Sequence, residues 1–259
     1  MADKPKQTQR VAVLTRPLGA DVLNAVRFDG TEGLSELFEF SIEAVGEGEP
    51  VDFNQAIGSN CTLSLEGKTT KREFCGVLTE ATHLEASASL NTYRLVLRPW
   101  LWLLSRTSDC RIFHRKSTPD IIQTVFRDRG FNDFEPRLSE SYPEREYCVQ
   151  YRESDLDFVC RLMEEDGIYF FFEHEEGKHT LVLADAKSSH KPIPGLDDLM
   201  YLPRVITGRT DTESIYEIIT NRSFQTGKIA LNDYDYEQPT ASMKSQHANA
   251  AGHARDSME

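Results

Sequence analysis

Apolar and polar side chains alternate along several short segments in the first third of the chain. The segments 60–66 and 93–98 both place apolar side chains at alternate positions, and the second has an apolar face of Tyr93, Leu95 and Leu97. Because strand side chains point alternately to opposite faces, this period of two predicts a sheet with one buried face. Segment 72–78 is a further predicted strand, with Gly76 as a candidate β-bulge. The glycines and asparagines between these short strands favour an antiparallel barrel or sandwich.

The apolar spacing changes to a helical period in the middle of the chain. Ser117 is a suitable cap for a first helix, which has a proline in its first turn and ends at Gly130. Ser154 caps a second helix, with Asp157 in the capping-box position and Gly167 as the stop. Apolar residues recur at helical spacing in both: Ile121, Ile122, Val125 and Phe126 in the first, Leu156, Val159, Cys160 and Met163 in the second.

An aromatic hairpin follows the second helix. The run 168–173 and the segment 180–184 are separated by a polar turn, and a strand so rich in aromatic residues needs cover on both faces. Further strands are predicted at 214–226 and 228–231. The polar segment 232–259 lacks the apolar content for a core of its own, so it is interpreted as disordered or as missing its continuation.

Composition and charge narrow the class of protein. The 259 residues carry a formal net charge of −13, which argues against a nucleic-acid binder. No stretch approaches the roughly 18 consecutive apolar residues of a membrane helix, so no integral membrane segment is predicted. The polar start of the chain has no signal-peptide pattern, which favours synthesis in the cytoplasm. Five singly spaced cysteines predict reduced, mostly buried thiols: Cys61, Cys75, Cys110, Cys148 and Cys160.

Candidate chemistry is sparse. None of the seven histidines has the spacing of a metal site, and His174 and His179, beside a hairpin turn, are interpreted as solvated. The acidic groups 164–166 and 173–176 would suit a glycosidase only with an opposing carboxylate across a cleft. A nucleophile elbow and a phosphate loop are both absent from the sequence, so no catalytic residue, cofactor or metal is predicted. The aromatic run 99–104 is interpreted as a buried junction between a strand and a helix.

The order of several segments is more specific than any one of them. These segments are 32–40, 52–58, 72–78, 93–104, 109–114, 118–122 and 145–169. Their succession closely resembles the N-terminal region of VgrG, the spike protein of bacterial type VI secretion, which is itself similar to contractile-phage baseplate hubs. The resemblance covers about residues 18–240 and is most specific over 145–169, which reads REYCVQYRESDLDFVCRLMEEDGIY.

This resemblance implies a mainly β, α+β fold with two related β-barrel hub modules and helical insertions. In such hubs three chains form a pseudo-sixfold ring that stacks on the hexameric Hcp tube, and the closed ring can cover the aromatic strands. The implied function is mechanical and not enzymatic. The homotrimer moves outward when a sheath contracts and helps to deliver effectors, and it leaves the cytoplasm through the type VI machinery without a signal peptide.

The resemblance also implies a division of the chain. A polar N-terminal segment (1–17) precedes part of a first β-barrel module (18–104). A helix-containing insertion, or part of the second module (105–175), follows, then the remaining hub strands (176–240) and a polar end (241–259). Complete VgrG proteins continue into a further barrel and a needle. The hub is therefore expected to be truncated here, with effectors and the spike-tip protein binding through regions outside this sequence.

Three alternatives remain at the level of sequence. The first is a tail hub of a contractile phage or prophage-derived particle, which belongs to the same structural class. The second is a cell-wall glycan hydrolase that uses the acids of 164–166. The third is an adhesin-like carbohydrate-binding module.

Overall fold

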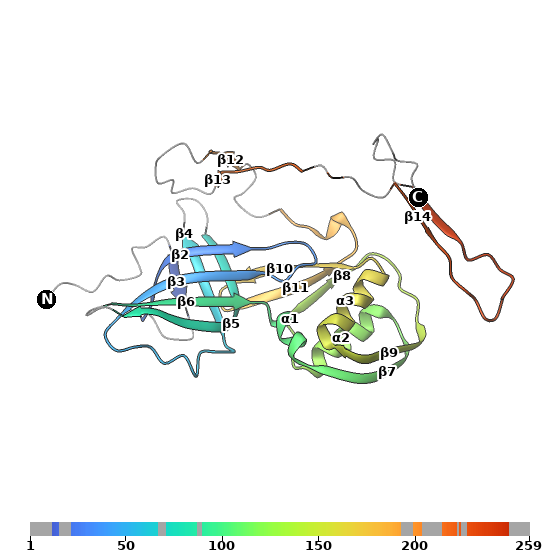
Figure 1. Cartoon of the computed structure of the whole chain (residues 1–259), viewed down its shortest axis with the longest axis horizontal. Helices are drawn as coiled ribbons and strands as arrows, with labels where there is room; N and C mark the ends of the chain where they lie inside the picture. Colours follow the sequence, from blue (N-terminus) through green and yellow to red (C-terminus); the bar gives the residue numbers. More distant parts are fainter. Residues whose placement is uncertain are drawn as a thin grey trace. The chain divides into compact units, whose positions relative to one another are not determined.

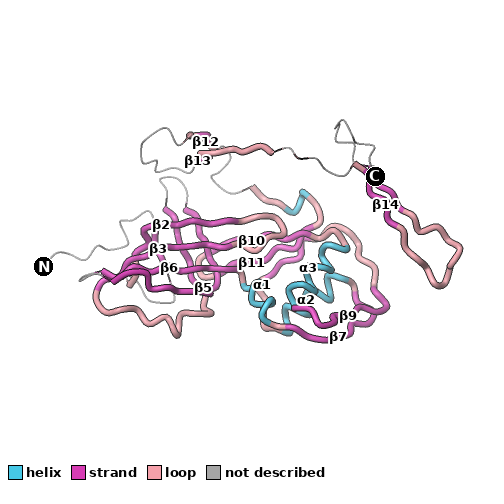
Figure 2. The backbone as a smooth tube through the Cα atoms, in the orientation of Figure 1, coloured by secondary structure: helices cyan, strands magenta, loops and turns pink. Residues whose placement is uncertain are grey.

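The computed structural model shows a mainly β protein in two compact units (Figures 1 and 2). The first unit comprises residues 1–199 and 209–213, and the second comprises 200–208 and 214–259; each is described by itself. The residues that the structure describes are 12–15, 22–66, 71–86, 90–192, 199–203, 214–221, 223 and 227–248. The predicted α+β, mainly β fold is confirmed. The division of the chain inferred from the resemblance stays a prediction.

The first unit begins with a six-stranded antiparallel sheet in the order β1-β4-β5-β6-β3-β2. Its strands are β1 (Ala12–Thr15), β2 (Asn24–Thr31), β3 (Glu39–Glu47), β4 (Asn60–Glu66), β5 (Lys71–Ala86) and β6 (Leu90–Arg98). The edge strands β1 and β2 also contact each other, so the sheet curls towards a barrel. Tyr93, Leu95 and Leu97 are buried on its inner face, as their alternation predicts.

Gly76 serves a different purpose from the predicted one. It pairs in regular register with β4, and the irregularities of β5 follow Leu78 and His83 instead, so the prediction of a bulge at Gly76 is wrong. A Cβ atom at Gly76 would lie 2.9 Å from the Cβ of Leu97 and 3.0 Å from the Phe38 ring. Glycine is needed here because a neighbouring side chain passes directly over the backbone.

A second, three-stranded sheet packs against the first. It has the order β10-β11-β8, with β8 (Phe134–Arg137), β10 (Tyr169–Glu175) and β11 (Lys178–Ala184). At the hairpin turn, the N–H of Gly177 donates to the Thr62 hydroxyl at 2.9 Å. Thr62 and Ser64 are therefore buried as well as their apolar neighbours, which corrects the prediction that β4 has only one buried face.

The chain itself covers much of the aromatic strand. Phe170 is buried in the core around the helices, and Phe172 packs against both cores of the first unit. On the other face of β10, the His190 ring stacks on Phe171 with 4.9 Å between ring centroids. Residues of the same chain therefore cover part of both faces of β10.

Helices and a two-stranded sheet are inserted between the two sheets. The elements are α1 (Trp100–Leu103), η2 (Leu104–Arg106), β7 (Ser108–Lys116), α2 (Thr118–Asp128), β9 (Arg145–Ser154) and α3 (Asp155–Glu165). A short helix, η3 (Lys187–Ser189), follows β11. Trp100, Leu101 and Leu104 are buried, which confirms the predicted strand-to-helix junction. Ser117 and Ser154 each accept a backbone N–H at their helix N-termini, so both predicted caps are confirmed.

The buried face of α3 is rotated relative to the predicted one. Leu156 and Cys160 are only half-buried, whereas Phe158 and Leu162 are fully buried beside the predicted Val159. The helix α3 contacts α2, and Phe158 belongs to the core around the helices, where it stacks on the Phe113 ring of β7 at 5.7 Å. The apolar residues of this helix are spaced so that the sequence alone is compatible with burial of either face.

The second unit contains two strand pairs. β12 (Met200–Tyr201) and β13 (Ser214–Ile215) are parallel, and β14 (Lys228–Leu231) pairs antiparallel with β15 (Ser245–Ala248). Of the strand predicted at 214–226, the described part beyond Ile215 (216–221 and 223) has no strand pairing, so the strand is shorter than expected. The interpretation of the polar end as disordered is wrong for β15, since backbone hydrogen bonds to β14 order it without an apolar core. Within the described residues, no helix has the length and apolar character that crossing a membrane requires.

Candidate functional site

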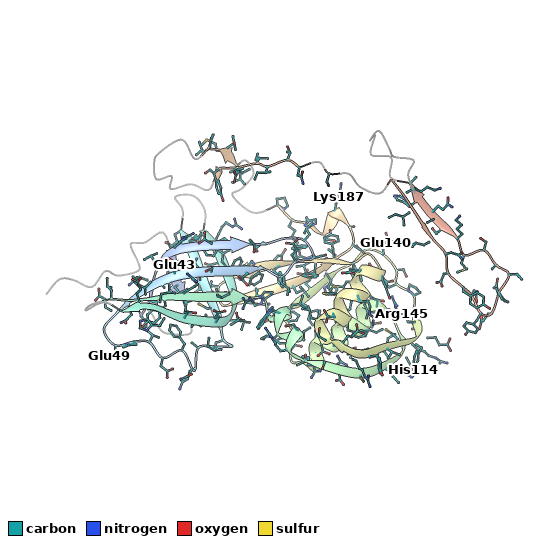
Figure 3. The ribbon with its side chains drawn as sticks, in the orientation of Figure 1. Glu43, Glu49, His114, Glu140, Arg145 and Lys187 are labelled. Carbon is teal, nitrogen blue, oxygen red and sulfur yellow. The ribbon has the colours of Figure 1, made fainter. Side chains whose placement is uncertain are left out.

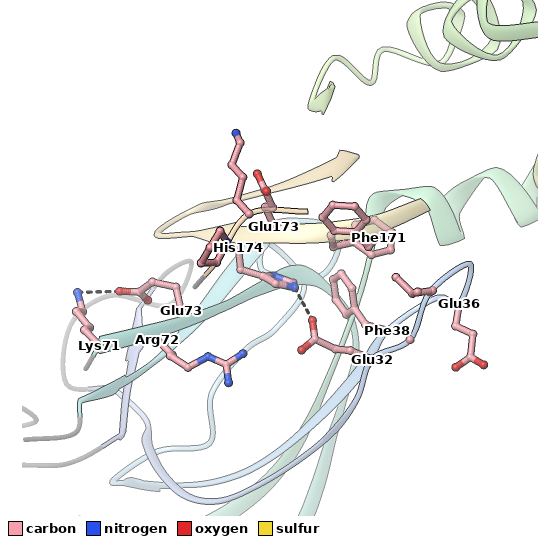
Figure 4. Close-up of a pocket in the computed structure, with 14 residues that line it drawn as sticks. Glu32, Glu36, Phe38, Lys71, Arg72, Glu73, Phe171, Glu173 and His174 are labelled. Carbon is pink, nitrogen blue, oxygen red and sulfur yellow. Dashed lines mark hydrogen bonds and ion pairs between the residues drawn. The ribbon is translucent and has the colours of Figure 1, made fainter. Parts of the chain in front are cut away.

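A groove of about 660 Å³ lies beside the six-stranded sheet, between the segment after β2, the start of β5 and the strand β10 (Figure 4). Its floor is aromatic, and its rim carries charges of both signs. The floor includes Phe38 and Phe171, and the rim includes Glu32, Glu36 and Lys71. An apolar floor under mixed charges suits contact with a protein side chain better than with a polyanion.

His174 joins the two walls of the groove. Its Nε2 lies 2.9 Å from a Glu32 carboxylate oxygen, and its Nδ1 lies 2.9 Å from the carbonyl oxygen and 3.2 Å from the amide nitrogen of Cys75. The ring also packs against Phe38 at 4.9 Å, so only a small part of the side chain reaches solvent.

His179 is fully buried, and the prediction that His174 and His179 are solvated turn residues is wrong. The two residues are directly opposed in the β10–β11 register, and both rings face the six-stranded sheet. The Trp100 N–H donates to His179 Nε2 at 2.9 Å. The proton of the neutral ring is therefore on Nδ1, which has no hydrogen-bond partner in the described part of the chain. Burial, aided by the nearby His174, lowers the pKa of His179 to about 3.

Replacing His179 with glutamine is expected to make folding less sensitive to acid. The folded-state pKa of about 3 lies below the unfolded value of about 6.5, so the unfolded chain binds the proton first. The stability from neutral His179 is present above about pH 6.5 and is lost as the pH falls towards 3. In that window the wild type is expected to lose up to about 1.4 kcal/mol per pH unit more than the variant.

Urea unfolding at a series of pH values from about 7 down to 4 measures this difference. The glutamine oxygen can still accept the Trp100 N–H, so the comparison isolates the titration from the loss of a hydrogen bond. If the free energy of unfolding had the same pH dependence in the wild type and in His179→Gln, the predicted role of His179 would be contradicted.

The acidic residues near the groove and helices are held by arginines. The Arg137 guanidinium makes two hydrogen bonds of 2.6 Å to Glu173, and these hold the pKa of that carboxyl below its usual range. Arg145 contacts both Glu165 at 2.7 Å and Asp166 at 3.2 Å. A glycosidase acid needs a raised pKa, so the downward shift at Glu173 is opposite to that requirement.

Asp155 is a buried charge that the sequence analysis did not single out. Its carboxylate accepts hydrogen bonds from Arg129 at 2.6 Å, Arg111 at 2.7 Å, the Thr107 hydroxyl at 2.6 Å and Gln150 at 2.8 Å. Burial by itself would raise the pKa of Asp155, but these hydrogen bonds and the arginine charges outweigh it and lower the pKa. From sequence, an acid in the first turn of a helix is ordinary, so no signal marked it.

The thiols match their prediction. All five cysteines are free, and Cys61, Cys75 and Cys148 are buried, while Cys110 is exposed. Burial raises the pKa of Cys61 to about 12 and that of Cys160 to about 11, which disfavours the reactive thiolate. In the described ranges, no three histidine, cysteine or acidic side chains come together as a metal-binding group.

Comparison with known proteins decides the family. The chain matches the phage tail baseplate hub (GPD) family over residues 31–259. The chain belongs to this family. It is 41% identical over 249 residues to the type VI secretion system spike protein VgrG1b of Pseudomonas aeruginosa, covering 96% of this chain and 34% of that protein. It is 42% identical over 234 residues to VgrG1c of the same organism, covering 90% of this chain and 32% of the relative.

A solved structure agrees with the assignment to the baseplate hub family. This Escherichia coli protein is described as a type VI secretion component with structural similarity to the T4 bacteriophage tail proteins gp27 and gp5. It superposes with a TM-score of 0.63 at 28% identity, over 71% of this chain and 50% of that one. The resemblance to VgrG predicted from the sequence is confirmed. The chain spans about one third of the length of the VgrG relatives, so whole-protein activities are taken up below as proposals.

Proposed function

We propose that this chain is part of the hub of a type VI secretion spike. Three copies form a ring at the tip of the Hcp tube, and the ring moves outward with the tube when the sheath contracts. The observation that carries this proposal is the 41% identity to VgrG1b over 96% of the chain. The curled six-stranded sheet with its helical insertion supports it, because a solved type VI component shares this fold.

The proposed role is mechanical. The groove acids Glu173 and Glu73 contact Arg137 and Lys71, and Glu165 contacts Arg145, so these carboxylates have structural partners. Effectors and a spike-tip protein would bind through parts of VgrG proteins that this chain does not span. The protein would be made in the cytoplasm and released by the type VI machinery. The high identity to VgrG spikes favours this role over that of a contractile-phage tail hub.

A chimera tests the proposal. The matching region of VgrG1b is replaced by this chain in a P. aeruginosa strain that lacks its other VgrG proteins, and Hcp release into the medium is measured. The chimera is expected to restore release, because a hub must fit both the tube and the rest of the spike. A matched chimera carrying Asp155→Asn, which disrupts the helical insertion, is the negative control. A chimera that accumulates to the VgrG1b level but releases no Hcp would contradict the proposal.

A further inference from the structure

The two-stranded sheet β7–β9 has an outward face that the described chain leaves uncovered. Paired residues of the two strands project from it, and we call this surface the ribbon face: Cys110, Ile112, His114, Tyr147, Val149 and Tyr151. Ile112 is 56% exposed, Tyr147 57% and Tyr151 63%. The alternate residues Phe113 and Cys148 are buried against the helices. The packed face thus combines apolar side chains with the polar pair Arg111 and Gln150, and the outward face is largely apolar but not packed. Uncovered apolar surface of this kind marks an interaction site.

Two arginines border the ribbon face. Arg115 and Arg152 are exposed, and in the described part of the chain neither forms an ion pair with a carboxylate. Both have left-handed backbone, with φ of 48° and 53°, which costs a non-glycine residue about 1 kcal/mol or more. The Arg152 guanidinium lies over the Tyr151 ring, 5.1 Å from its centroid. Tyrosine and arginine side chains are enriched at the energetic centres of protein interfaces.

The other end of the first unit is acidic. Here the loop after β3 meets the ends of β5 and β6, and Glu47 is directly opposite Leu90 in the strand register. We call this surface the acidic end; its exposed acids are Glu47, Glu49, Asp52 and Glu85. Among the described residues, none of the four forms an ion pair with a basic side chain. Leu84 and Leu90 are also exposed, at 38% and 42%, so the acidic end carries apolar surface too.

The two surfaces are complementary and lie at opposite ends of the unit. Figure 3 shows Glu49 and His114 at these two ends, and Figure 1 shows β7 and β9 running below the helices, in the part of the unit to the right of the six-stranded sheet. A contact between two different patches of identical chains is heterologous, and it closes into a ring when the rotation allows. Paired opposite charges would also offset the repulsion between chains that each carry −13.

We propose that in the assembled hub the ribbon face of one copy contacts the acidic end of the next copy. This inference rests on the proposed function, because it assigns surfaces to the ring. Arg115 and Arg152 face the acids of the neighbour. Tyr147, Tyr151 and Ile112 cover its exposed leucines, so each contact has an apolar centre and a charged rim.

Charge exchange tests the pairing. Sedimentation equilibrium of the full chain is expected to give a mass three times the 29.5 kDa of one chain. The variant R115E/R152E and the variant E47K/E49K are each expected to weaken association tenfold or more, because like charges then meet. Combining all four substitutions restores opposite charges and is expected to return the affinity to near that of the wild type.

Three controls make the result decisive. K187E changes an exposed charge in η3, away from both surfaces, and is expected to leave association unchanged. Circular dichroism and thermal unfolding verify that every variant folds, since exposed substitutions of this kind alter stability little. Hcp binding is measured in parallel. Loss of Hcp binding with an unchanged trimer would assign the ribbon face to the tube and overturn the proposal.

The outcomes separate the two proposals. If the wild type is a trimer and the variant R115E/R152E is also a trimer of unchanged affinity, the assignment of the ribbon face is overturned, but the proposed function is not. Failure of the quadruple variant to regain association overturns the pairing between these two surfaces. A wild-type chain that stays monomeric at its highest soluble concentration overturns the ring contact, whereas the chimera's release of Hcp independently decides the spike function.

Discussion

Replacing Asp155 with asparagine is expected to lower the free energy of unfolding by about 3–5 kcal/mol. The carboxylate is fully buried and joins Arg129 of the α2 C-terminus to Arg111 of β7 at the start of α3. Removing its charge leaves two guanidinium groups, only partly exposed, without their central partner. With carboxylates the two cations keep only longer contacts, to Asp109 at 3.5 and 3.8 Å and to Asp128 at 3.6 Å, so the cost arises from the loss of the short charge-assisted hydrogen bonds in a buried network.

Chemical denaturation at neutral pH measures this change. Glu165→Gln is a suitable control, because its ion pairs with Arg145 and Arg161 are largely exposed and are expected to contribute about 1 kcal/mol or less. Since the pKa of Asp155 is lowered in the folded state, its contribution is present above the unfolded pKa of about 3.9 and is lost in stronger acid. An Asp155→Asn protein within 1 kcal/mol of the wild type would show that the network contributes little.

Replacing Phe38 with alanine is expected to cost about 3–5 kcal/mol. The ring is 1% exposed and stacks on Phe40 at 4.5 Å. It also meets Phe172 of the hairpin edge-on at 5.0 Å, so one side chain joins the two sheets. Because the ring lies directly over Gly76, which has no side chain to move into the space, the cavity left by alanine cannot be refilled from below.

Thermal or urea unfolding of three variants tests this role. Leu34→Ala removes an apolar side chain from the same groove, but Leu34 is 60% exposed and its loss is expected to cost well under 1 kcal/mol. Phe38→Leu keeps part of the volume and is expected to fall between the two. Equal losses for Phe38→Ala and Leu34→Ala would contradict a central packing role for Phe38.

The candidate site shows where reasoning from sequence stops. His174 and His179 lie close to a turn, and turns are usually solvated. The hairpin, however, packs one face on a sheet formed about a hundred residues earlier in the chain, and both histidines are on that face. The partner of His174 is Cys75, 99 positions away, so no local pattern reports the contact. Asp155 was missed for a similar reason, because Arg111 and Arg129 come from other elements.

The sequence by itself determined the local elements of this protein. The alternation in 93–98 and the caps at Ser117 and Ser154 depend on neighbours within one strand or one turn, and the structure confirms them. The alternation in 60–66 predicted the strand β4 but not its second buried face. The order of segments also determined the baseplate hub family. Only the tertiary structure showed that β4 is buried on both faces and that the side chains of Phe38 and Leu97 leave no room for a Cβ atom at Gly76. It also showed that β7–β9 keeps an apolar face exposed. Burial is set by what packs across from a residue, and a periodic pattern does not specify that partner.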